Sequence, residues 1–136
     1  MEKYTVANDI VLFGIEVKNF PARIKETFDI LYDQLGNDRA YYGLSWFDED
    51  NKIKYFAMAP ELSPDEHKKY DYETLVLRKG VYSTVTILNW LSKTDSIKDV
   101  FHELMKDSSP DKQNPCVEWY KSDDEMMCMV RDVNQS

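Results

Sequence analysis

The chain has 136 residues, a formal net charge of −8 and a pI near 4.7. Its 43% hydrophobic and 31% charged residues are typical of a globular domain and exclude a disordered chain. The acidic balance argues against direct binding to nucleic acid or to an anionic membrane surface, because both interactions depend on Lys and Arg. The same charge suits cationic partners, although solubility alone also accounts for it.

The first half of the chain predicts a strand, a helix and a hairpin, in that order. A largely apolar run predicts a strand over residues 10–17, and apolar positions at helical spacing follow over residues 20–35. Residues 41–47 and 52–59 predict two strands joined by an acidic turn. The polar stretch 60–69 contains two Pro and is expected to connect the two halves.

The second half repeats this order of elements. Residues 72–77 predict a strand, and residues 81–88 are rich in the β-branched and aromatic residues that favour another. One apolar stripe predicts a helix over about residues 95–106. Strands are then expected over residues 116–120 and 126–130, again on either side of an acidic turn.

Weak sequence similarity accompanies the repeated order. Residues 24–28 (IKETF) align with residues 97–101 (IKDVF) at an offset of 73, and the acidic turns at 48–50 and 123–125 align at an offset of 75. Amphipathic helices also resemble one another by chance, but order, spacing and turn composition agree here. We therefore predict an internal duplication.

The predicted fold class is α+β, with two strand-helix-strand-strand pseudo-repeats over about residues 1–60 and 70–133 of a single domain, 1–136. These repeats are expected to form a concave antiparallel sheet with two helices on one face. A duplicated sheet of this kind is expected to create a groove between its halves, and such junctions are preferred ligand sites.

Neither the cysteines nor the histidines predict a metal or a cofactor. In a hairpin that turns at the second acidic turn, Cys116 would face residues 131–132 and Cys128 would face residue 120, too far apart for a disulfide. Two reduced thiols fit a cytoplasmic protein. The spacing of these cysteines with His67 and His102 is not a zinc pattern. The sequence contains neither an apolar run long enough to span a membrane nor a signal-peptide pattern.

Two motifs of the second half resemble the GyrI-like family of small-molecule-binding domains. Residues 72–82 (YETLVLRKGVY) resemble that family's strand, turn and G-x-Y strand, and residues 115–120 (PCVEWY) resemble its P-x-x-E-x-Y strand. The first half, from residue 11 through the hairpin that ends at residue 59, is similar to the family's first repeat in layout. Members include the effector-binding domains of AraC-type and MerR-type multidrug regulators. This chain has no room for their DNA-binding domain, so it resembles a stand-alone member.

The resemblance implies a concave sheet that holds aromatic, often cationic, compounds. It implies that Glu118, the Glu of the P-x-x-E-x-Y strand, lies in the pocket and meets the positive charge of the ligand. It also implies that some stand-alone members act as antidotes or as hydrolases of reactive small molecules. The gyrase-inhibitor name of the family points to a third role, the binding of a protein that acts on DNA.

The residues around Glu118 support a role for its carboxylate. Strand alternation puts Cys116, Glu118 and Tyr120 on one face and Val117 and Trp119 on the other. We expect the Val117 face to pack on the helices, which would turn Glu118 into the groove. A buried carboxylate has a raised pKa and is costly unless a cation compensates its charge. An exposed Glu, or one paired with Lys or Arg, remains the alternative.

Aromatic side chains are the expected walls of the pocket, because a ring over a cation contributes roughly 0.5–2 kcal/mol. Tyr82 follows Gly80 and can offer a ring and a hydroxyl, and Tyr41 occupies the position equivalent to Cys116. Each ring could equally belong to the core. The predicted ligand-binding residues are Glu118, Tyr82, Tyr41, Tyr120, Trp90 and Phe13.

The sequence therefore predicts an effector-binding protein that senses or sequesters aromatic, cationic compounds, with Glu118 as charge partner. Two alternatives stay open: a hydrolase that uses Glu118 as general acid/base, and a protein that binds and inhibits a DNA-acting enzyme. A binding function is favoured over an enzyme, because no triad motif or phosphate loop is visible. The expected partners are a small molecule and a regulatory protein.

Overall fold

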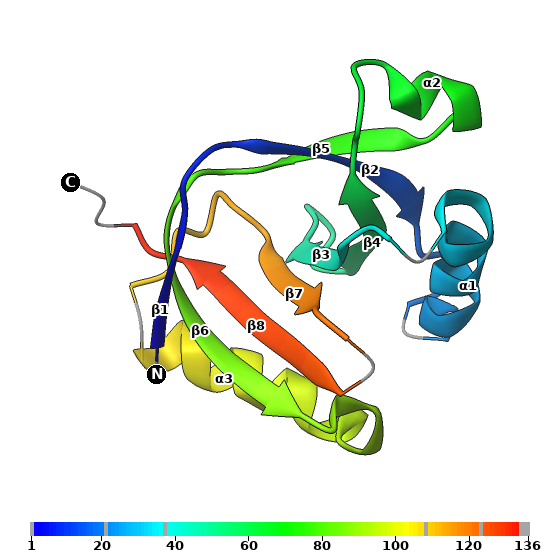
Figure 1. Cartoon of the computed structure of the whole chain (residues 1–136). Helices are drawn as coiled ribbons and strands as arrows, with labels where there is room; N and C mark the ends of the chain where they lie inside the picture. The colour runs from blue at the N-terminus through cyan, green and yellow to red at the C-terminus, as the bar shows by residue number, and fades with distance from the viewer. Residues whose placement is uncertain (1, 21, 37, 108, 123, 134–136) are drawn as a thin grey trace. The chain divides into compact units, whose positions relative to one another are not determined.

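The structure is a computed structural model that describes residues 2–20, 22–36, 38–107, 109–122 and 124–133. The chain divides into two compact units. The β2 unit is Ile10–Leu77, and the β6 unit combines Met1–Asp9 with Arg78–Ser136. Each unit is an antiparallel sheet with helices (Figure 1), so the predicted α+β class is confirmed.

The β2 unit holds its strands in the order β3-β4-β2-β5. Its described elements are the strands β2 (Ile10–Glu16), β3 (Tyr41–Phe47), β4 (Ile53–Pro60) and β5 (Glu73–Leu77) and the helices α1 (Ile24–Leu35) and α2 (Glu66–Tyr70). The predicted helix over 20–35 begins four residues late, because Arg23, with φ −114° and ψ 20°, lies outside the helical region. Phe20 instead stacks its ring on Tyr55, with the centroids 5.0 Å apart.

The β6 unit holds its strands in the order β1-β6-β8-β7. Its described elements are the strands β1 (Glu2–Val6), β6 (Gly80–Leu88), β7 (Cys116–Tyr120) and β8 (Glu125–Arg131), the 3-10 turns η1 (Trp90–Ser92) and η2 (Thr94–Ser96), and the helix α3 (Ile97–Asp107). Apart from β1, all of these strands were expected. Part of the predicted acidic turn, Asp123, lies outside the described residues.

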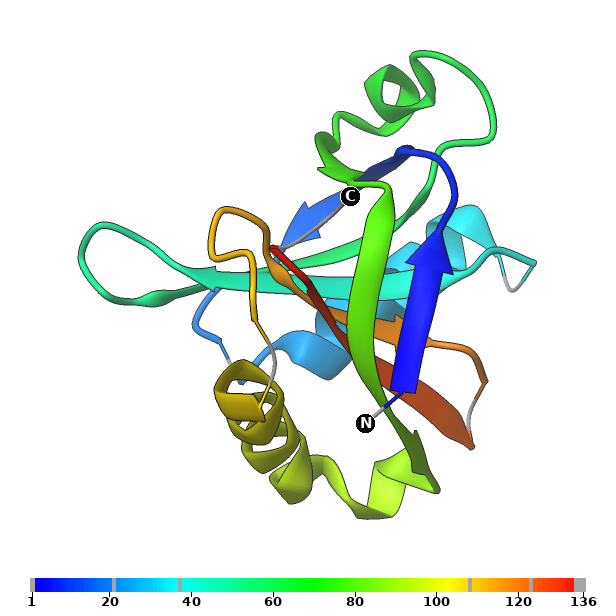
Figure 2. The same ribbon diagram turned by 90° about the vertical axis from the view of Figure 1, so that its left-hand side faces the viewer.

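In each unit, one edge strand is next in sequence to a strand of the other unit. Strand β1 precedes β2 in sequence but pairs with β6, and β5 precedes β6 but pairs with β2. Figure 2 shows β1 running beside β6. Both units therefore have the same strand order: an edge strand, the strand before α1 or α3, and then the second and the first strand of the hairpin that follows that helix.

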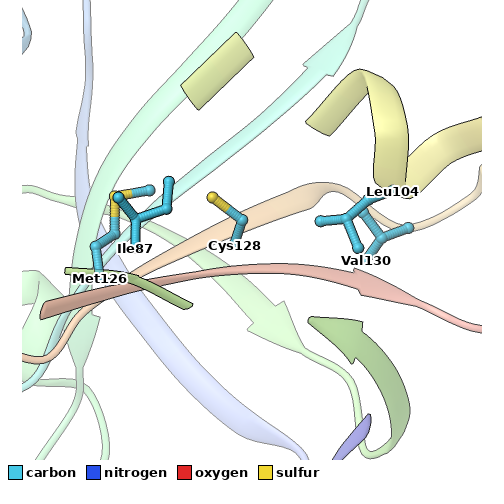
Figure 3. Packing of buried hydrophobic residues seen from close by; sticks show 5 residues of the cluster. All are labelled: Ile87, Leu104, Met126, Cys128 and Val130. Atoms are coloured by element: carbon cyan, nitrogen blue, oxygen red, sulfur yellow. The ribbon is translucent and has the colours of Figure 1, made fainter. Parts of the chain in front are cut away.

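The core of the β6 unit lies between its sheet and α3. Strand register puts Ile87, Met126, Cys128 and Val130 on one face, where they pack against Leu104 of α3 (Figure 3). Leu104 is one of the apolar positions that predicted the helix, and it is fully buried. This cluster defines the helix-facing side of the sheet in the β6 unit.

Strand β1 is held by a polar network on the same side of the sheet. The ammonium group of Lys3 donates to Ser83 Oγ at 2.7 Å and to Asp132 Oδ2 at 2.8 Å. Ser83 Oγ donates in turn to Asp132 Oδ1 at 2.7 Å. Ser83 has no exposed surface, so this Ser, Lys and Asp cluster anchors the strand and is unsuited to attack a substrate.

A buried ion pair fixes the α2 segment of the β2 unit. Both terminal nitrogens of Arg39 donate to the carboxylate of Glu66, and Arg39 Nη1 also donates to the carbonyl of Pro60 at 3.2 Å. The amide of Leu62 donates to Glu66 at 2.8 Å. The hydrogen bond from Arg39 is the main reason that the pKa of Glu66 falls to about 2, despite burial, which opposes ionisation.

The lowered pKa of Glu66 predicts a specific acid sensitivity. Its stabilisation is fully present above an unfolded-state pKa of about 4.3 and is lost as the pH falls through the folded value of about 2. We expect the stability advantage of the wild type over Glu66→Gln to shrink across that window and to be constant above it. Urea unfolding of both proteins between neutral pH and acid tests this, and an advantage that does not change with pH contradicts it.

Candidate functional site

The face of β7 that carries Glu118 is turned toward α3. Glu118 lies opposite Cys128 in the β7–β8 ladder, and Cys128 belongs to the cluster beneath α3. Cys116 and Tyr120, the neighbours of Glu118 on this face, also pack against that cluster. The expectation that the face of Val117 and Trp119 packs on the helices is therefore wrong.

The reason for the error is that both faces of β7 are covered. Val117 is 1% exposed on the other face, opposite Met129, and Trp119 there contacts the ring of Tyr4 from β1, with the centroids 5.5 Å apart. Alternation shows which residues share a face, but it cannot choose the helix-facing side when both faces are covered.

Three of the predicted site residues come together on the helix-facing side. The hydroxyl of Tyr120 donates to Glu118 Oε1 at 2.6 Å. The ring of Trp90, in η1, lies 5.0 Å from the ring of Tyr120 at an interplanar angle of 59°. Trp90 is itself anchored by its indole nitrogen, which donates to the carbonyl of Ser122 at 2.9 Å. We call Glu118, Tyr120 and Trp90 the β7 site.

The two thiols lie beside the carboxylate of the β7 site. Burial, and then the nearby charge of Glu118, raise the pKa of Cys116 to about 11 and the pKa of Cys128 further. Both thiols are therefore protonated at neutral pH and are poor nucleophiles. The predicted register was wrong, since Cys128 faces residue 118, not residue 120. The thiols are accordingly diagonal neighbours on one face.

Tyr82 lies on the opposite face of the same sheet. Tyr82 pairs with Tyr4 and Arg131. The residues directly before and after it in β6 face α3 instead. Its side chain is 1% exposed, its hydroxyl donates to the carbonyl of Arg78 at 2.7 Å, and burial raises its pKa to about 12. Within the β6 unit, Tyr82 is thus separated from Glu118 by the sheet.

Tyr41 and Phe13 belong to the β2 unit and have their own neighbours there. The ring of Tyr41 lies 4.4 Å from Tyr32 of α1, and its hydroxyl donates to the carbonyl of Gly36. The fully buried ring of Phe13 contacts Tyr70 and Tyr72 and lies 5.4 Å below the guanidinium of Arg39. Both rings fill the layer between sheet and helices. The predicted groove between the pseudo-repeats stays a prediction.

The β2 unit also has a hollow with a volume of 290 Å³ that sequence reasoning did not find. It is lined by Gly14, Ile15, Glu16, Lys18, Asp71, Tyr72 and Glu73. Hydrogen bonds from Lys18, and more weakly from Lys54, lower the pKa of Glu16. The lining also carries the acidic side chains of Asp71 and Glu73, but Tyr72 is its one aromatic ring, whereas the β7 site has two.

The chemistry of the β7 site is that of a single carboxylate beside two aromatic rings. Within the part of the chain that the structure describes, no three His, Cys, Asp or Glu side chains are grouped so as to hold a metal ion. None of the described helices has the length and apolar composition that a membrane crossing requires. With one carboxylate and two rings, the β7 site can attract positive charge, stack against a ring, or exchange a proton.

Comparisons with known proteins establish the fold and no more. No family model matches the chain, and no curated protein matches its sequence. An integron cassette protein from the mobile metagenome of Vibrio cholerae is 16% identical, with a TM-score of 0.68 over 96% of this chain and 94% of that one. SAV2435, solved in a complex with tetraphenylphosphonium, is also 16% identical. Its TM-score is 0.67 over 96% of this chain and 93% of that one.

A third solved structure has the same fold. It is a candidate bacterial transcription regulation protein from Staphylococcus aureus MU50, 15% identical, with a TM-score of 0.59 over 96% of this chain and 97% of that one. At these identities the chain shares an architecture with all three proteins.

Proposed function

We propose that the protein binds small aromatic cations at the β7 site, with Glu118 as the partner of the positive charge. The observation that carries the proposal is the half-buried carboxylate of Glu118, which accepts a hydrogen bond from Tyr120 at the border of an apolar layer. The charge of this carboxylate attracts a cation, and the neighbouring apolar layer leaves less water to screen that attraction.

The rings of the β7 site add a second reason. The rings of Trp90 and Tyr120 lie 5.0 Å apart at a tilt of 59°, and the hydroxyl of Tyr120 contacts the carboxylate, so a cation near Glu118 would also approach an aromatic ring. Each such contact is worth roughly 0.5–2 kcal/mol. Tetraphenylphosphonium, the ligand of SAV2435, combines a positive charge with four phenyl rings. Ligands of that class suit a carboxylate flanked by aromatic and thiol groups.

Access to the β7 site would depend on the elements that cover it. Ile97, Val100, Phe101 and Met105 of α3 pack on the cluster to which Cys116 and Tyr120 belong. A bulky ligand would have to move α3 or the short 3-10 turns before it. Those turns are exposed for most of their length and cost less to displace than a strand.

We infer that binding serves to sense or to sequester the ligand. The similarity in fold to a candidate transcription regulator supports sensing, with the signal passed to a separate regulatory protein. The identical strand order of the two units supports an origin by internal duplication, as the repeated order of elements in the sequence predicts.

Replacing Glu118 with Gln is expected to weaken the binding of methyltriphenylphosphonium by about ten- to hundredfold. The amide keeps the shape of the side chain but removes its charge. Isothermal titration should also show that triphenylphosphine oxide, a neutral compound of similar shape, binds the two proteins equally. Glu103→Gln, an exposed position on α3, is the matched control and should behave like the wild type. Equal affinity of wild type and Glu118→Gln for the cation would refute the charge pairing.

A hydrolase remains the second candidate, because a hydroxyl and a carboxylate 2.6 Å apart can pass a proton. In that case Glu118→Gln should abolish turnover of a strained electrophile while neutral ligands still bind. Absence of turnover by the wild type across epoxides and cyclopropanes would leave binding as the only function of the site.

A further inference from the structure

Strand β5 is an open sheet edge. It pairs with β2 on one side, and none of the described strands pairs with its other side (Figure 1). Such an edge presents unpaired amides and carbonyls to any extended segment that fits. Exposed apolar side chains lie on it and on its neighbour: Val76 is 37% exposed, and Val11, which faces it from β2, is 45% exposed.

The equivalent edge of the β6 unit is protected where β5 is not. Strand β1 carries Glu2 and Lys3, and charged side chains, Lys above all, discourage edge-to-edge pairing. Strand β5 has the sequence ETLVL, with Glu73 as its single charge and neither Lys nor Pro. This contrast between two strands in the same place in their units suggests that the β5 edge has a partner.

The sequence around β5 is complementary to itself when antiparallel. If Leu75 faces its own copy in the run DYETLVLRK, Glu73 faces Leu77, and the other pairs are Thr74 with Val76, Tyr72 with Arg78, and Asp71 with Lys79. Opposite charges and β-branched residues are favourable cross-strand pairs, and an Arg beside a Tyr ring adds a cation–π contact. The side chain of Arg78 is 60% exposed, and its ion pair with Asp9 is long, at 3.9 Å. Arg78 can therefore turn toward a second copy.

We propose that β5 pairs with β5 of a second copy of this chain, about a two-fold axis at Leu75. Such an isologous contact needs one self-complementary surface, which the run 71–79 provides. The backbone of β5 then completes its hydrogen bonds, and the exposed Val76 lies beside Thr74 of the second copy. The proposal does not depend on the ligand of the β7 site.

Sedimentation velocity of the full chain, from micromolar to millimolar concentration, tests the proposal. We expect a monomer–dimer equilibrium for the wild type, a monomer for Val76→Lys, and wild-type behaviour for Leu88→Lys, a matched exposed position on β6. Circular dichroism checks that the variants are folded. A wild type that stays monomeric, or a dimer that Val76→Lys leaves intact, overturns the proposal.

Disulfide capture tests the register and does not require Val76→Lys to fold. Thr74→Cys and Val76→Cys proteins are prepared separately, mixed and oxidised. The mixed disulfide should form faster than either homodimeric disulfide, because Thr74 faces Val76 of the second copy. The native thiols interfere little, since burial raises the pKa of both Cys116 and Cys128. Equal rates for all three disulfides would overturn this register.

Discussion

Replacing Arg39 with Met is expected to lower the free energy of unfolding by about 3–5 kcal/mol. The side chains of Arg39 and Glu66 are only 10% and 8% exposed. Without the guanidinium, the Glu66 carboxylate keeps the Leu62 amide as a donor but loses its charge partner, and the Pro60 carbonyl loses a hydrogen bond. A buried charge left without its partner is among the most destabilising of single changes.

The double variant Arg39→Met/Glu66→Met separates charge from packing. Removing both charges replaces the ion pair with apolar contacts, so most of the lost stability should return. Urea unfolding of the wild type, the single variant and the double variant gives the comparison. A loss below about 1 kcal/mol in the single variant would mean that the pair behaves like an exposed one.

Gly14→Ala is expected to cost about 3 kcal/mol or more, because no space exists for a methyl group. A Cβ at this position would lie 2.0 Å from the carbonyl oxygen of Ala57 and 2.9 Å from Cα of Met58. Both atoms belong to the backbone of β4, so the strand itself would have to move. The clash arises where β2 and β4 pair, in the middle of the β2 unit.

Gly36→Ala is the control for Gly14→Ala, because the two positions require a glycine for different reasons. Gly36 ends α1 with a φ of 87°, and apart from Gly36 and its chain neighbours no described residue lies within 4 Å of an added Cβ. Its replacement should cost only the strain of this positive-φ, extended backbone conformation, which favours Gly, about 1–3 kcal/mol. Thermal and urea unfolding of both variants checks the ranking. A smaller loss for Gly14→Ala than for Gly36→Ala would contradict the close approach of the strands.

The sequence predicted most elements of the fold because their hydrophobic periodicity is strong. It missed β1, whose residues EKYTV are exposed except for Val6 and carry two charges, so that no apolar face is visible. It also could not show that β1 and β5 pair with strands far from them in sequence. Those pairings depend on backbone hydrogen bonds in three dimensions, which leave no local pattern.

The candidate site was predicted in part. Glu118, Tyr120 and Trp90 come together because β7 and η1 belong to one unit, whereas Tyr82 is on the other face of the sheet and Tyr41 and Phe13 fill the core of the other unit. Two errors have physical causes. Both faces of β7 are covered, which hid the helix-facing side, and a shift of one or two residues in the β7–β8 hairpin misplaced the cysteines.

The central claim, that an aromatic cation binds beside Glu118 on the helix-facing side of β7, is tested most directly by nuclear Overhauser effects from the ligand. We predict contacts from the phenyl protons of bound tetraphenylphosphonium to the rings of Trp90 and Tyr120. These contacts should be lost in Glu118→Gln under the same conditions. Contacts confined to residues of the β2 unit, or contacts that persist in Glu118→Gln, would contradict the account.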